Sequence, residues 1–167
     1  IECNFYSQSV DAIRKEMTNE GFDHSKLSNQ DCAMRWQAWK RRIVPTGRRM
    51  VLKSNGFNCP PNLLHSLADL EQAFKDGAEI WPWQSKLIDR PDFEDGLYND
   101  YRVVHFHLGT DFEPSGYINR TDELLFAIVD SGSVYEIGIY RHGDWYELDT
   151  LNIIDENWPR LLDAVTI

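Results

Sequence analysis

Two histidines separated by a single residue lie in the stretch from Tyr101 to Gly109. This stretch has the alternating pattern of a β-strand, in which successive side chains point to opposite faces. His105 and His107 should therefore lie side by side on one surface of a sheet. Tyr101 and Val103 share that surface, while the opposite, core-facing side carries Val104, Phe106 and Leu108.

A second strand is predicted at residues 134–141. The turn at residues 130–133 should join it to an apolar strand at residues 123–129 through a two-residue loop, Ser131-Gly132. The resulting register is apolar throughout, which makes it self-consistent. Its pairs are Ile128 with Tyr135, Phe126 with Ile137, and Leu124 with Ile139.

The other face of this returning strand carries Glu136, Tyr140 and, just beyond it, His142. If both strands belong to one sheet with one core, these groups share a face with His105 and His107. Gly138 lies between them and has no side chain, so we expect a hollow there for a ligand.

A basic cluster lies upstream of the predicted sheet. Six basic residues and no acidic residue fall between positions 40 and 53, in a chain whose net charge is −10. An arginine fork suits a phosphate because it donates two parallel hydrogen bonds. A solvated face, or pairing with the protein's own acids, is the alternative. We expect substrate phosphates to contact Arg41, Arg42, Arg48, Arg49 and Lys53.

Paired histidines suit acid–base catalysis because imidazole titrates near neutral pH. Together with a basic cluster, they favour cleavage of RNA, where the 2′-hydroxyl is the nucleophile and no metal or other cofactor is needed. His105, His107 and His142 are the acid–base candidates. Tyr140 would position the substrate or donate a proton, and Arg120 would stabilise charge on the phosphate.

The order of these segments resembles the RelE/ParE type of toxin, one of a set of small ribonuclease folds that includes barnase-like and colicin-like nucleases. The likeness covers residues 98–148 and rests on Tyr101-Arg102, Leu124-Leu125-Phe126, Tyr135-Glu-Ile-Gly-Ile139 and Arg141-His142. It implies an endoribonuclease of the toxin type, with RNA and a cognate antitoxin as partners. By position, it places catalytic groups on the exposed face of the sheet at His105, His107, Arg120, Tyr140 and His142.

Two other functions remain open. His105 and His107, joined by His142 and by Glu136 or Asp144, would make a metal site of three histidines or of two histidines and a carboxylate. The HxH pair is also like the first motif of a cupin, although only Glu113 stands near the position of the next cupin ligand and the second motif is missing. Alternatively, the histidines are hydrogen-bonded beneath a helix, and the acidic chain is an immunity- or antitoxin-like protein that binds a basic partner.

The elements that would position these residues suggest an α+β fold in a single domain. We expect a helical extension at residues 1–80, an antiparallel sheet of about four strands at residues 98–148, whose last strand is residues 145–148, and a C-terminal helix at residues 151–167. Net charge −10 argues against nonspecific coating of nucleic acid. The three cysteines form no CxxC pair, and neither a signal peptide nor a membrane span is evident, so a reduced cytoplasmic setting is expected.

Overall fold

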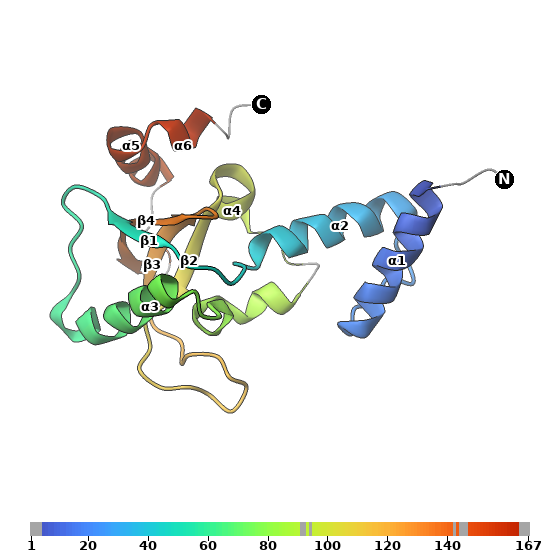
Figure 1. Ribbon diagram of the computed structural model, residues 1–167, viewed down its shortest axis with the longest axis horizontal. Helices are drawn as coiled ribbons and strands as arrows, with labels where there is room; N and C mark the ends of the chain where they lie inside the picture. Colours follow the sequence, from blue (N-terminus) through green and yellow to red (C-terminus); the bar gives the residue numbers. More distant parts are fainter. Residues whose placement is uncertain (1–4, 91–92, 94, 142, 144–146, 164–167) are drawn as a thin grey trace. The chain divides into compact units, whose positions relative to one another are not determined.

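The computed structural model describes residues 5–90, 93, 95–141, 143 and 147–163 (Figure 1). The fold is α+β, as the sequence predicted, with helices mainly in the N-terminal half, a four-stranded sheet and short helices at the end. The sheet differs from the prediction in two ways: it is mixed and not antiparallel throughout, and its strand at Met50–Lys53 lies outside the predicted residues 98–148. The chain forms two compact units, one of residues 1–43 and 86–93 and the other of residues 44–85 and 94–167. No described helix has a stretch long and apolar enough to cross a membrane.

The first unit is a helical hairpin closed by a short 3-10 helix. It consists of α1 (Phe5–Asn19), α2 (Asn29–Arg42) and η3 (Lys86–Asp89). Ser28 is the N-cap of α2, and its hydroxyl accepts the Asp31 N–H. Helical spacing of the apolar residues gives the hairpin its own small core of Met17, Cys32, Trp36 and Trp39.

The second unit is built on a mixed sheet in the order β1-β4-β3-β2. The strands are β1 (Met50–Lys53), β2 (Val103–His107), β3 (Glu123–Val129) and β4 (Ser133–Arg141). Strands β2, β3 and β4 pair antiparallel, and the edge strand β1 runs parallel to β4. The β3–β4 loop is the expected pair Ser131-Gly132, closed by Asp130 N–H donating to Ser133 O.

Helices cover both faces of this sheet (Figure 1). One face packs on α3 (Leu64–Asp76), which is preceded by η1 (Pro61–Leu63) and ends at Gly77 in the left-handed conformation. The other face packs on α4 (Gly96–Tyr101) and α5 (Glu147–Asn157), which α6 (Arg160–Asp163) follows. The sheet therefore separates two cores, and apolar side chains are required on both of its sides.

The expectation of one core and one polar face was wrong for this reason. In the observed register His105 lies opposite Phe126, and Val103 opposite Ile128, so the histidine face is itself an apolar, covered face. Glu136 lies opposite Ala127 instead, and both belong to the face that packs on α3. Glu136 and the two histidines are thus on opposite sides of the sheet.

A β-bulge in β4 corrects the predicted register. Ile128 pairs with Tyr135 as predicted, but Phe126 pairs with Gly138 and Leu124 with Tyr140, which leaves Ile137 as the extra residue. Ser54, just after β1, donates its hydroxyl to Ile137 O at 2.8 Å and so satisfies the carbonyl at the bulge. The bulge turns Tyr140 onto the histidine face, where an unbroken strand would have placed Ile139.

The segment after β4 is helical where the sequence suggested a strand. Residues 145 and 146 of the expected last strand lie outside the described residues, whereas Glu147 and Leu148 begin α5. Residues 151–163 are helical apart from a break at Trp158-Pro159, which separates α5 from α6. Proline cannot donate the backbone hydrogen bond that would continue the first helix.

Candidate acid–base site on the covered face of the sheet

His105 is paired with a carboxylate that the sequence did not suggest. Its Nδ1 lies 3.8 Å from Oδ2 of Asp95, and the two side chains are 17% and 18% exposed. Asp95 is the N-cap of α4, and its other carboxylate oxygen accepts the Tyr98 N–H at 3.2 Å. A carboxylate so fixed can orient the imidazole and stabilise the imidazolium formed when His105 takes up a proton.

His107 is the deeper of the two imidazoles, with only 2% of the residue exposed. The rings lie almost perpendicular, with centroids 6.3 Å apart, so the predicted juxtaposition is present. The Thr121 N–H faces Nδ1 of His107 at 3.4 Å. If Nδ1 accepts this N–H, the single proton of the neutral imidazole must be on Nε2.

Tyr140 shares this face but does not reach His105. The Phe126 ring stands between them, 6.0 Å from the His105 centroid and 5.4 Å from the Tyr140 centroid. A Cβ at Gly138 would lie 2.9 Å from the Tyr140 ring, so the expected hollow is filled by that ring. Burial raises the pKa of Tyr140, and the Asp149 carboxylate raises it further, which keeps the phenol protonated at neutral pH.

Arg120 comes from the connector between β2 and β3. The connector folds back at Gly109, where an added Cβ would lie only 2.3 Å from Asn119 O. The Trp81 ring packs edge-on against the Tyr117 ring of the connector, with the ring centroids 4.9 Å apart. Arg120 is exposed and its guanidinium lies 3.5 Å from the Ser85 hydroxyl. Its neighbour Thr121 contacts His107, so the arginine is attached to the segment that borders the site.

The basic cluster is divided between the two units, and its members have different surroundings. Arg42 is 4% exposed and donates to the carbonyls of Arg90 and Phe93. Arg49 is 5% exposed and donates to the carbonyls of Asp130, Gly47 and Pro45. These two guanidinium groups tie backbone segments together. Lys53 is exposed but forms an ion pair with Glu71 at 2.7 Å. Lys40, Arg41 and Arg48 are also exposed.

Glu136, one of the two carboxylates suggested for the metal site, cannot join His105 and His107, because it lies on the other side of the sheet. The other proposed ligands, His142 and Asp144, lie outside the described residues. Within the described ranges, no three His, Cys, Asp or Glu side chains are grouped so that they could hold a metal ion.

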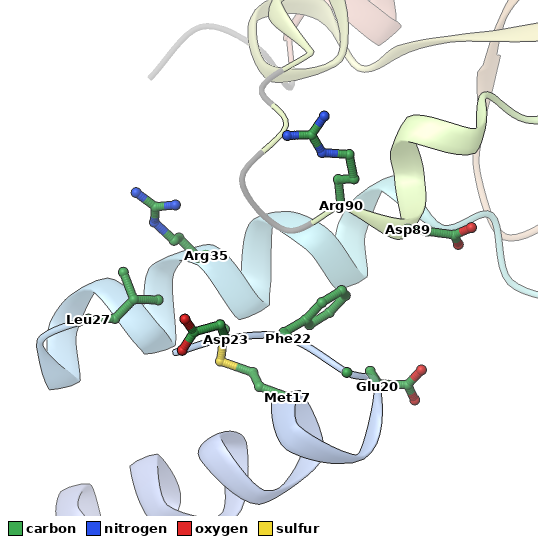
Figure 2. A pocket seen from close by; sticks show the side chains of 9 residues that line it. Met17, Glu20, Phe22, Asp23, Leu27, Arg35, Asp89 and Arg90 are labelled. Atoms are coloured by element: carbon green, nitrogen blue, oxygen red, sulfur yellow. The ribbon is translucent and has the colours of Figure 1, made fainter. Parts of the chain in front are cut away.

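The first unit contains a separate cavity of about 450 Å³ beside the loop that joins α1 to α2 (Figure 2). Arg14 holds its loop by donating to His24 O and Leu27 O. None of the lining residues is a histidine or cysteine, and charges of both signs mix at the edge, so the cavity suits acid–base chemistry less well than the sheet. Its lining comprises Met17, Glu20, Gly21, Phe22, Asp23, Leu27, Arg35, Asp89 and Arg90.

Asp95 is a candidate site residue that the sequence analysis did not identify. It is the N-cap of the short helix α4, which begins at Gly96. An aspartate just before a helix is a recognised N-cap signal. No local signal predicts that the same carboxylate faces an imidazole ten residues later.

Comparison with known proteins adds no candidate function. No protein-family model, curated protein or solved structure gives a significant match to the chain.

Proposed function

We propose that the protein is a metal-independent endoribonuclease whose acid–base group is His105. The observation that supports this best is the His105–Asp95 pair, a partly exposed imidazole held 3.8 Å from a carboxylate that is itself fixed at a helix N-terminus. The resemblance in strand order to small ribonuclease toxins favours the same chemistry.

In this proposal His105 is the general base. Its imidazole removes the proton of the ribose 2′-hydroxyl, and the 2′ oxygen attacks the adjacent phosphorus. The bond from phosphorus to the 5′ oxygen breaks, and that oxygen takes a proton from water. The products are a 2′,3′-cyclic phosphate and a 5′-hydroxyl. The Asp95 carboxylate stabilises the imidazolium until it returns its proton to water.

The other predicted residues have supporting roles in this scheme. Arg120, exposed on the bordering connector, would bind the phosphate as charge develops on it. His107, at 2% exposure, acts as a positioning residue that packs beside His105. Tyr140, held from His105 by Phe126, belongs to the wall of the site.

The test uses a single-stranded RNA oligonucleotide in the presence of EDTA, with an all-deoxy oligonucleotide of the same sequence. We expect cleavage of the RNA alone, ending in a cyclic phosphate. His105→Ala should lower the rate by roughly 10²- to 10⁴-fold, and Asp95→Asn should lower it less. His65→Ala is the matched control because His65 is exposed on α3. Intact RNA, or full activity of His105→Ala, would refute the proposal.

A non-catalytic acidic binding protein is the second candidate. It is favoured by the burial of His107 beneath a covered face and by the backbone contacts of Arg42 and Arg49. In that case the purified protein shows no turnover of RNA. It instead forms a stoichiometric complex with a basic partner that weakens as salt is added, and His105→Ala leaves the complex intact.

A further inference from the structure

The Glu136 side chain is fully buried, at 0% exposure, in the layer between the sheet and α3. Neither carboxylate oxygen has a hydrogen-bond partner within the described residues. The surrounding cluster is apolar, with Leu70, Ala127 and Val134 among its members. An ionised carboxylate is costly in such a place unless it is paired and hydrogen-bonded, so the protonated form is favoured.

The charges around Glu136 come from two elements and one loop. Burial raises the pKa of Glu136 to about 8, and the Glu71 carboxylate raises it while Lys53 and Lys75 lower it. Cys59 is the remaining titratable neighbour, and burial raises the pKa of its thiol. Glu136 is therefore mainly a carboxylic acid at neutral pH.

Lys53 stands between two carboxylates. Its ammonium lies 2.7 Å from Oε1 of Glu71 on α3 and 4.0 Å from Oε2 of Glu136, its register partner on β4. Glu71 has a second cation, Lys75, at 3.2 Å on its own helix. Lys53 can thus exchange one carboxylate for the other by a small side-chain movement, and Glu71 would keep Lys75.

We propose that Lys53, Glu71 and Glu136 form a proton-operated switch between β1 and α3. While Glu136 holds its proton, Lys53 pairs with Glu71 and ties β1 to α3. When Glu136 loses the proton, Lys53 moves to Glu136, and Glu71 remains paired with Lys75 within α3. The ion pair between β1 and α3 is then replaced by an ion pair between β1 and β4.

The switch is independent of the proposed ribonuclease function. It lies on the face opposite the His105–Asp95 pair, so either proposal can fail without the other.

The decisive experiment is a pair of double-mutant cycles in urea unfolding at pH 6 and pH 9 with Lys53→Met, Glu71→Gln and Glu136→Gln. The coupling between Lys53 and Glu71, expressed as a factor in the unfolding equilibrium constant, should be at least threefold smaller at pH 9 than at pH 6. The coupling between Lys53 and Glu136 should rise by a similar factor. In the Glu136→Gln background the first coupling should not change with pH. The Glu123–Arg141 ion pair, whose side chains are 30% and 69% exposed, is the control and should show the same coupling at both pH values.

A second measurement covers the case in which a variant does not fold. In the wild-type protein labelled with ¹³C at glutamate side chains, one carboxyl resonance should titrate above pH 7. Its midpoint should coincide with a shift of the Lys53 Nζ resonance. If every glutamate titrates below pH 5, or if the Lys53–Glu71 coupling is the same at both pH values, the switch does not exist.

Discussion

Arg48 and Arg49 are adjacent in the sequence but have opposite environments. Arg48 is exposed, whereas Arg49 is 5% exposed and donates to three backbone carbonyls around the start of β1. A lysine cannot reproduce the planar fork, so Arg49→Lys leaves buried acceptors unsatisfied.

We expect Arg49→Lys to lower the free energy of unfolding by about 2 to 3 kcal/mol. Arg48→Lys, the matched control, should change it by less than about 0.5 kcal/mol. Urea denaturation of the two variants measures both effects. Equal stability of the two would mean that the three carbonyl contacts of Arg49 contribute little.

Glu136 makes the stability of the fold depend on pH in a defined direction. The ordinary pKa of its carboxyl is 4.5, and burial raises the pKa in the folded protein to about 8. Between these values the unfolded chain has released the proton and the folded chain still holds it. Stability from this group is therefore complete below about pH 4.5 and is lost as the pH rises toward 8.

The loss should amount to about 1.4 kcal/mol of unfolding free energy per pH unit between pH 5 and 8. Urea unfolding across that range measures the slope, and Glu136→Gln should remove this contribution because an amide does not titrate. Glu123→Gln, on β3, should leave the slope unchanged. A wild-type slope that Glu136→Gln does not alter would contradict the prediction.

At the scale of elements, the bulge in β4 depends on a contact from β1. The Ser54 hydroxyl donates to Ile137 O, and the Ser54 N–H donates to Glu136 O. Ser54→Ala removes the first of these and leaves a buried carbonyl without its donor. It should cost about 1 to 3 kcal/mol of unfolding free energy.

Ser131→Ala is the control for that variant, because Ser131 is exposed in the β3–β4 loop, and it should be close to neutral. Thermal or urea unfolding distinguishes the two. A neutral Ser54→Ala would show that the bulge carbonyl is satisfied without the hydroxyl.

The sequence predicted the helical N-terminal part and the C-terminal helix because helix signals are local. Ser28 and Gly77, for example, mark the beginning of α2 and the end of α3. The placement of His105 and His107 on the same face of one strand was likewise predicted from alternation alone. The face of Glu136 was not, because it depends on the register between β2 and β3 and on the presence of a second core. Both are set by residues distant in the sequence, such as Ile154 on α5.

For the whole molecule, the distribution of charge limits how RNA would be bound under the proposed function. The net charge is −10, and three of the five basic residues predicted to contact phosphate are held by carbonyls or by Glu71. Among the residues predicted to contact phosphate, three arginines are exposed, namely Arg41, Arg48 and Arg120. Binding under the proposed function should therefore rely on few phosphate contacts.

For a single strand, each neutralised phosphate contributes about −0.7 to the slope of log affinity against log salt. Three contacts predict a slope of roughly −2, to be measured with the His105→Ala variant because its cleavage of the RNA should be slow. Fluorescence anisotropy with a labelled oligonucleotide between roughly 50 and 200 mM salt measures this slope. Arg120→Gln should make it shallower by about 0.7, whereas Arg49→Lys should leave it unchanged. A slope several times steeper would mean that a larger basic surface, and not these few arginines, holds the RNA.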